Sequence, residues 1–160
     1  MVLKKFKFVY CDPSKCVGCG ICELVCSLKH ENRFSSVASR IRSVRLYPYR
    51  NVALTCVLCE NPPCVKACPR DALTQAQDGH IVVDEDKCVG CGLCIEACDF
   101  GVIMLHPLRM VAIVCDLCDG SPLCIDACPE DALTLTSRDI RAQIKRVEVA
   151  KKLTGGSSEG

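Results

Sequence analysis

The cysteines of this chain fall into four closely spaced groups, and this arrangement limits the possible folds more than any other feature. Of the 17 cysteines among 160 residues, all but one belong to these quartets. The first and third quartets have the spacing C-x-x-C-x-x-C-x-x-x-C, and the second and fourth lengthen the middle gap by two or three residues. The quartets are Cys16, Cys19, Cys22 and Cys26; Cys56, Cys59, Cys64 and Cys68; Cys88, Cys91, Cys94 and Cys98; and Cys115, Cys118, Cys124 and Cys128.

So high a cysteine content indicates either a disulfide framework or metal centres. The sequence MVLKKFKFVY lacks the apolar stretch and cleavage site of a secretion signal, and no apolar run approaches the length of a membrane span. We therefore expect a cytoplasmic protein with reduced thiols and no direct membrane span, unless a partner subunit carries an export signal for both. Structural zinc sites typically combine two C-x-x-C pairs across a longer gap, and this triplet spacing is different.

The spacing favours iron–sulfur clusters. Cysteines at i, i+3 and i+6 can bind three corners of a [4Fe–4S] cluster, and a fourth cysteine, followed by proline, often serves the other cluster of a pair. The pattern occurs four times, so we expect four [4Fe–4S] clusters. Gly18, Gly20, Gly90 and Gly92 would let the backbone curl around the inorganic core and direct N–H groups at sulfur.

Composition agrees with a metal-dependent fold. Aromatic residues make up 4% of the chain and tryptophan is absent, so a conventional core would be thin, and metal binding can supply folding free energy. The formal charge is +1. Each cluster with its four thiolates adds about −2, so the loaded protein would carry roughly −7. We therefore expect no nucleic-acid partner.

The chain is an internal duplication. YPYRNVALTCVLC, from Tyr47, aligns with HPLRMVAIVCDLC, from His106, and the first repeat carries about 13 extra residues between its two quartets. A second alignment matches KFVYCDPSKCVGCGIC near the N-terminus to HIVVDEDKCVGCGLC before the third quartet. The fourth quartet followed by the first therefore repeats, in circular order, the unit formed by the second and third.

These alignments predict an α+β fold of two pseudo-symmetric, bacterial-ferredoxin-like modules. The outer module would comprise residues 1–46 and 106–136, the inner module residues 47–105, and residues 137–160 a C-terminal helix and flexible tail. We expect crossed ligation within each module. The four predicted ligand sets are the Cys16 set (Cys16, Cys19, Cys22, Cys128), the Cys115 set (Cys115, Cys118, Cys124, Cys26), the Cys56 set (Cys56, Cys59, Cys64, Cys98) and the Cys88 set (Cys88, Cys91, Cys94, Cys68).

Local patterns predict sparse secondary structure. KFKFVY and GHIVVD alternate like short strands, and DALTLT and DALTQA are predicted to be their return strands. The residues between the last two cysteines of each quartet suggest a helical turn, which we expect Pro69 and Pro129 to stop. SRDIRAQIKRVEVAKKL predicts an amphipathic helix with Ile140, Ile144 and Val147 on one face, followed by a disordered TGGSSEG.

Four further side chains could join a site. Cys11 stands outside the quartets and aligns with Val83, so we expect a small buried hydrophobic residue rather than a ligand. His30, His80 and His106 are not expected to bind metal, because sixteen thiolates suffice for four clusters.

The sixteen cysteines and the duplicated layout, over about residues 5 to 136, resemble four-cluster ferredoxin-like electron-transfer subunits. Such subunits serve dimethyl sulfoxide reductase and formate dehydrogenase, and a ferredoxin linked to carbon-monoxide dehydrogenase is similar. The resemblance implies that the first quartet shares a module with the fourth, and the second with the third. By its short linkers the chain is also similar to the compact small subunits of tungsten aldehyde oxidoreductases and benzoyl-CoA reductases, which implies a complex without a membrane anchor.

The function predicted is therefore non-catalytic electron transfer. The chain would relay electrons between a catalytic tungsten or molybdenum oxidoreductase subunit, in an anaerobic setting, and a flavin subunit or soluble ferredoxin. One alternative is a free-standing polyferredoxin, which would lack an apolar docking face such as residues 27–46 or the C-terminal helix would offer. A second alternative, an enzyme subunit with a substrate-binding cluster, needs an iron without a thiolate, and all four quartets are complete.

Overall fold

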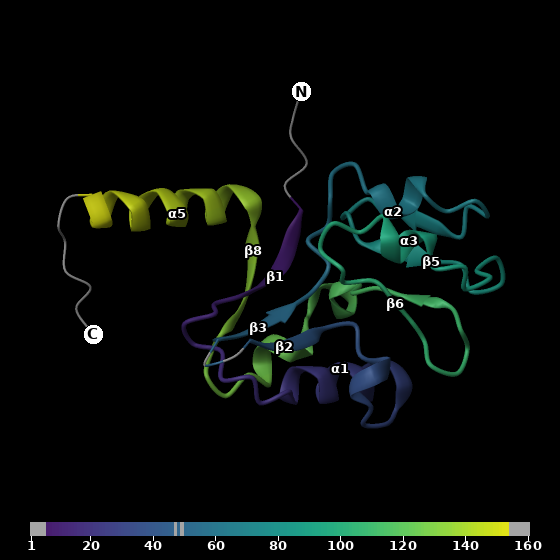
Figure 1. Ribbon diagram of the computed structural model, residues 1–160, viewed down its shortest axis with the longest axis horizontal. Coiled ribbons are helices and arrows are strands. Elements are labelled where there is room, and N and C mark those ends of the chain that lie inside the picture. Colours follow the sequence, from purple (N-terminus) through teal and green to yellow (C-terminus); the bar gives the residue numbers. More distant parts are fainter. Residues whose placement is uncertain (1–5, 47, 49, 154–160) are drawn as a thin grey trace.

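The structure is a computed structural model that describes residues 6–46, 48 and 50–153, so the expected tail TGGSSEG lies outside the described residues. Within these ranges the chain forms short helices and two-stranded antiparallel sheets, which confirms the predicted α+β fold class (Figure 1). The strand pairs are β1 (Lys7–Cys11) with β8 (Leu133–Ser137), β2 (Arg42–Leu46) with β3 (Arg50–Leu54), β4 (Leu73–Gln75) with β5 (Ile81–Val83), and β6 (Met104–Leu105) with β7 (Ala112–Ile113).

Two of these pairs are the predicted ones. β1 and β8 come from opposite ends of the chain, and Cys11 lies opposite Leu133 in their register. β4 and β5 form the equivalent pair, with Leu73 opposite Val83. The β1–β8 pair brings the fourth quartet to the first, as the circular alignment requires. The exact division of the chain into two modules stays a prediction.

The other two pairs were not predicted. β2 and β3 pair from Arg42 opposite Leu54 to Leu46 opposite Arg50, and β6 pairs with β7 over two residues. β3 and β7 lie in the two segments that the duplication aligns. The strands that face them differ in length, because β2 starts within the insertion of the first repeat whereas β6 has only two residues.

A helical turn occurs inside every quartet, as predicted. The helices are α1 (Ile21–Glu31), α2 (Pro63–Lys66), α3 (Leu93–Glu96), α4 (Leu123–Asp126) and α5 (Arg138–Leu153), with 3-10 turns η1 (Ser36–Ala38) and η2 (Leu117–Gly120).

Proline is not required to end these turns, and the stopping role expected of Pro69 and Pro129 stays a prediction. α3 ends at the same place in its motif as α2, although Asp99 rather than proline follows its last cysteine. Each short helix instead tightens at its end, because the N–H of the last cysteine bonds to a carbonyl three residues back. These bonds are Cys68 to Val65 at 3.3 Å, Cys98 to Ile95 at 3.1 Å and Cys128 to Ile125 at 3.1 Å.

α1 continues well beyond its quartet. Buried Ser27 follows Cys26 and supports the longer helix: its hydroxyl donates to the Leu24 carbonyl at 2.9 Å and accepts the Ser35 N–H at 2.9 Å. The helix ends at Asn32, which is left-handed at φ 51 and whose N–H bonds to the Leu28 carbonyl. The first residues of the insertion therefore form the last turns of α1.

α5 forms as predicted and extends away from the rest of the chain (Figure 1). On its predicted apolar face, Ile140, Ile144 and Val147 are 49%, 40% and 55% exposed. Near its start, the guanidinium of Arg141 lies 3.4 Å from the ring centroid of Tyr10. Across residues 6–46, 48 and 50–153, every helix is too short or too polar to cross a membrane.

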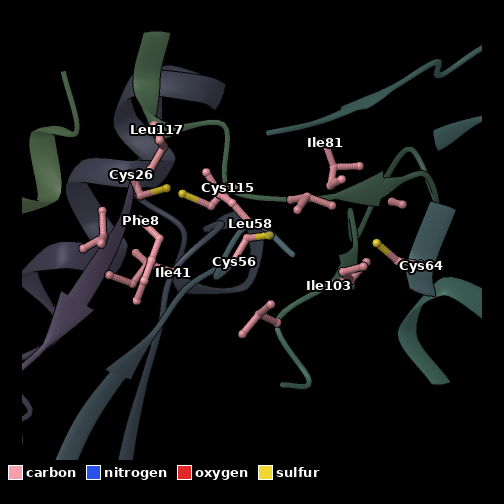
Figure 2. Close-up of a cluster of buried hydrophobic side chains, with 14 of the residues drawn as sticks. Phe8, Cys26, Ile41, Cys56, Leu58, Cys64, Ile81, Ile103, Cys115 and Leu117 are labelled. Carbon is pink, nitrogen blue, oxygen red and sulfur yellow. The ribbon is translucent and has the colours of Figure 1, made fainter. Parts of the chain in front are cut away.

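Cysteine side chains form part of the core. Figure 2 shows Cys26, Cys56, Cys64 and Cys115 among buried aliphatic side chains. Leu58 is only 1% exposed. Thiols therefore form a substantial part of the interior beside the aliphatic side chains, in keeping with the low aromatic content.

Candidate metal centres

The Cys16 set surrounds a hollow. Cys16, Cys19 and Cys22 come from the loop before α1 and from its first turn, and Cys128 comes from the segment after α4. All four line one hollow with about 360 Å³ of non-atom space. This space is continuous with solvent, so the four thiols line a recess that opens at the surface.

The Cys88 set surrounds an equivalent hollow. Cys88, Cys91, Cys94 and Cys68 line about 310 Å³ of non-atom space next to α3. Gly90 is part of this lining, and its φ is +67. A Cβ on Gly90 would lie 2.2 Å from a backbone carbonyl oxygen, so only glycine fits where this loop approaches the segment before β7.

The Cys56 set is gathered between α2 and the end of α3. Burial raises the pKa of Cys64 to about 12, and the nearby sulfurs of Cys56, Cys98 and Cys59 contribute. Burial likewise raises the pKa of Cys56 to about 11. Four thiols from two quartets thus lie close enough to influence one another.

The Cys115 set is gathered in the same way between α4 and the second turn of α1. Burial raises the pKa of Cys124 to about 12, and the sulfurs of Cys26 and Cys118 contribute. Burial also raises the pKa of Cys115, with smaller contributions from Cys124, Cys26 and the Cys56 sulfur. The two buried sets therefore adjoin at Cys115 and Cys56, which Figure 2 shows with Leu58 beside them.

All four predicted sets are thus brought together, although iron ligation by these residues stays a prediction. The raised pKa values mean that the buried thiols hold their protons until a metal displaces them, so loading would release protons. Backbone N–H groups already point at sulfurs in three of the sets: Arg40 at Cys26 (3.3 Å), Ala72 at Cys68 (3.3 Å), Ala112 at Cys88 (3.4 Å) and Ala132 at Cys128 (3.4 Å).

Cys68 shows what these donors do. Burial pushes its pKa up, but the N–H groups of Arg70, Ala72 and Leu73 outweigh burial and lower it. These N–H groups therefore stabilise the thiolate form of Cys68 by more than burial destabilises it. Thiol-only donor sets and N–H groups aimed at sulfur fit a [4Fe–4S] cluster in their chemistry.

The backbone turns left-handed at the second residue after the first cysteine of every quartet. Gly18 and Gly90 do so at φ +71 and +67, as the glycine pattern suggests. The same position holds Leu58 at φ +48 and Leu117 at φ +61. Sequence reasoning missed these leucines, because a non-glycine side chain gives no signal of a left-handed backbone.

Cys11 is buried, as predicted, at 4% exposure. Burial raises its pKa to about 11. The backbone of Ala53 lowers this pKa and the thiol of Cys16 raises it, so both lie close to the Cys11 sulfur. Cys11 therefore lies against a predicted ligand, without being one of the four thiols that line the hollow.

The histidines make contacts that the sequence did not indicate. His80 bonds to its neighbour Asp78 at 2.6 Å. His106 is 1% exposed and bonds through Nε2 to Glu31 at 3.1 Å. His30 reaches Cys118, with Nε2 3.8 Å from Sγ. Glu31 and His30 belong to the extended end of α1, whose path could not be read from the cysteine spacing.

Comparison with known proteins agrees with this geometry. Residues 13–29 and 81–104, which contain the first and third quartets, each match the 4Fe-4S binding domain family. The polyferredoxin-like subunit of aliphatic sulfonate oxidoreductase from Pyrococcus furiosus is 39% identical over 161 aligned positions, covering 92% of this chain and 93% of that protein. This protein belongs to the polyferredoxin-like family of [4Fe–4S] electron-transfer proteins.

Other relatives of this polyferredoxin-like protein show how far the likeness extends. The electron transfer subunit PhsB of thiosulfate reductase from Salmonella typhi is 36% identical over 111 residues, covering 65% of this chain and 58% of that protein. One component of the active-site complex BamBC of benzoyl coenzyme A reductase aligns over 97% of this chain and 94% of its own, with a TM-score of 0.51 and 24% identity. The last comparison shows a shared fold.

Proposed function

We propose that this polyferredoxin-like protein carries four [4Fe–4S] clusters, one in each predicted ligand set, and relays electrons as a non-catalytic subunit of an oxidoreductase. The observation that carries the proposal is the gathering of sixteen cysteines into four groups of four, each group drawn from two quartets. Their two-module organisation, with residues 1–46 and 106–136 outside and 47–105 inside, follows from the same groups.

The burial of the sets supports an order along the protein. Cys19 of the Cys16 set and Cys91 of the Cys88 set are exposed, whereas the Cys115 and Cys56 sets contain no exposed cysteine. The two buried sets adjoin at Cys115 and Cys56. We therefore order the clusters as Cys16 set, Cys115 set, Cys56 set and Cys88 set, with one exposed cluster at each end.

The chemistry supplied by bound clusters is one-electron transfer. The chain's part is to hold each set rigidly, to surround the two inner sets with apolar side chains such as Leu58, and to leave the two end loops open. Val17 and Val89, beside the end sets, are 56% and 62% exposed. An electron would enter at one of these loops and leave at the other.

Exposed apolar side chains support a subunit rather than a freely diffusing carrier. Phe34 and Val37 of the insertion are 68% and 56% exposed, and the apolar face of α5 is uncovered within the described chain. The Pyrococcus relative is a subunit of an oxidoreductase. We infer a catalytic tungsten or molybdenum subunit at one end and a flavin subunit or soluble ferredoxin at the other, in the reducing cytoplasm of an anaerobic cell.

Metal analysis of the anaerobically purified chain tests the cluster content. Four clusters require about 16 irons and 16 acid-labile sulfides per chain, with a reduced EPR spectrum broadened by coupling between neighbouring clusters. Cys59→Ala should remove up to about four irons, and Cys11→Ala, the matched control, none. A wild-type count near 12, or zinc without sulfide, would contradict the four-cluster proposal.

Co-purification tests the partner assignment separately. The chain would be expressed with and without residues 138–160 in its native host, and proteins retained with it identified. Retention of a tungsten or molybdenum enzyme by the full chain supports the proposal. A fully loaded chain that remains alone at every concentration would instead indicate a free-standing carrier. Equal retention by the shortened chain would remove α5 from the docking surface.

A further inference from the structure

The Cys115 set differs from its counterpart, the Cys56 set, in the side chains that cover it. The two sets occupy equivalent places in the duplicated sequence, but Asp116 stands where the second quartet has Val57. The insertion of the first repeat adds His30 and Arg40 on the same side. Three polar side chains thus gather at Cys118, whereas the aligned position beside Cys59 is apolar.

His30 is directed at the sulfur of Cys118. Its Nε2 lies 3.8 Å from Cys118 Sγ and 3.5 Å from Asp116 Oδ1, and the three atoms lie within 4.8 Å of one another. A carboxylate and a metal-bound thiolate both accept hydrogen bonds, so Nε2 must carry the proton. The His30 side chain is 11% exposed, which limits competition from water.

Asp116 and Arg40 hold this arrangement in place. Asp116 Oδ1 accepts the N–H of Cys118 at 3.0 Å, and Oδ2 accepts from the guanidinium of Arg40. The backbone N–H of Arg40 donates to Cys26 Sγ at 3.3 Å. Arg40 therefore contacts one cysteine of the set directly and a second through Asp116, so the insertion covers both sides of the set.

We propose that His30, oriented by Asp116 and Arg40, is a positioning residue that hydrogen-bonds Cys118 and raises the reduction potential of the cluster in the Cys115 set. One electron from a redox partner reduces the cluster, no bond forms or breaks, and no proton moves. An N–H···S bond stabilises the more negative reduced form, so it favours reduction. The inference rests on the proposed function, because it requires a cluster in this set.

An EPR-monitored redox titration of the full, anaerobically purified chain tests the inference. His30→Leu removes the donor, His30→Gln restores an N–H, and Arg33→Leu removes an exposed positive charge from the same insertion as a control. Cys118→Ser identifies the relevant step, because an oxygen ligand alters or abolishes that cluster's signal. In His30→Leu the ratio of reduced to oxidised cluster at that step should fall about tenfold at fixed potential, or about 59 mV for one electron.

At the other steps of the titration, the ratio of reduced to oxidised cluster in His30→Leu should stay within about twofold of the wild type. The reduction potential assigned to the Cys115 set should shift less in His30→Gln than in His30→Leu. In Arg33→Leu no potential should shift. Unchanged potentials in His30→Leu, or an equal shift of every step, would overturn the inference while leaving the four clusters intact. A wild-type iron count well below 16 would instead overturn the proposed function.

If His30→Leu loses its clusters, a second measurement tests the inference without that variant. Pulsed EPR on reduced wild-type chain labelled with ¹⁵N-histidine should show a nitrogen coupling that is absent in His30→Gln. Lack of that coupling in the wild type would overturn the inference.

Discussion

Glu31→Gln tests the hydrogen bonds and ion pair that join the end of α1 to the segment between β6 and β7. The Glu31 side chain is 7% exposed and accepts hydrogen bonds from Arg109 at 2.9 and 3.0 Å and from His106 Nε2 at 3.1 Å. His106 Nδ1 accepts the N–H groups of Leu108 and Arg109, so its single neutral-state proton lies on Nε2, facing the carboxylate.

The expected cost follows from the pKa of Glu31. The hydrogen bonds from Arg109, and then that from His106, outweigh burial and lower it from 4.5 to about 2. This difference corresponds to about 3 kcal/mol in favour of the ionised form. Because Arg109 is 41% exposed and solvent screens the pair, we expect a cost of about 2 kcal/mol. The pKa is depressed, so this stability is complete above pH 4.5 and is lost as the pH falls towards 2.

Thermal unfolding of the loaded chain under anaerobic conditions at pH 7 measures this cost, with far-UV circular dichroism at a fixed scan rate. A loss of about 2 kcal/mol should lower the apparent midpoint by about 4–8 °C. Glu85→Gln is the matched control, because Glu85 binds the same Arg109 at 3.2 Å but is 51% exposed. Its expected cost is about 0–1 kcal/mol. Equal midpoints for the two variants would refute the reasoning.

Three further substitutions, two of them paired with a control variant, test the site and its packing. Gly90→Ala would place a Cβ 2.2 Å from a carbonyl oxygen, so this variant should lose about four of about 16 irons. Gly92→Ala is the control, because its Cβ would have nothing within 4 Å. It should cost only about 1–2 kcal/mol of backbone strain and retain its iron. Cys11→Val should keep all its iron by metal analysis, and loss of four irons would make Cys11 a ligand. Leu58→Ala should lower the unfolding free energy by about 2–5 kcal/mol, and Leu108→Ala, at a site 71% exposed, by less than about 0.5 kcal/mol; comparable losses would contradict the packing assigned to Leu58.

The features that repeat in the sequence are the ones that could be predicted from it. The cysteine spacing and the two alignments predict the β1–β8 and β4–β5 pairs, the helical turns and the four groups of thiols. They miss the β2–β3 and β6–β7 pairs, although β3 and β7 lie in aligned segments. The long end of α1 belongs to the insertion of the first repeat, so no second copy reveals it. The Glu31–His106 bond joins residues 75 positions apart and has no local pattern.

The difference between glycine and leucine at the left-handed positions follows the proposed order of clusters. Gly18 and Gly90 lie in the end sets, where a Cβ would meet Asn51 Oδ1 at 2.7 Å and the Met110 carbonyl oxygen at 2.2 Å, so the chain leaves no room for a side chain. Leu58 and Leu117 lie in the two inner sets and are 1% and 8% exposed. A left-handed leucine costs about 1–2 kcal/mol of strain, but burying its side chain contributes about 1.5–3 kcal/mol. Burial therefore offsets the strain only where the fold leaves room for the side chain, which is why the same backbone carries leucine in the inner sets and glycine in the end sets.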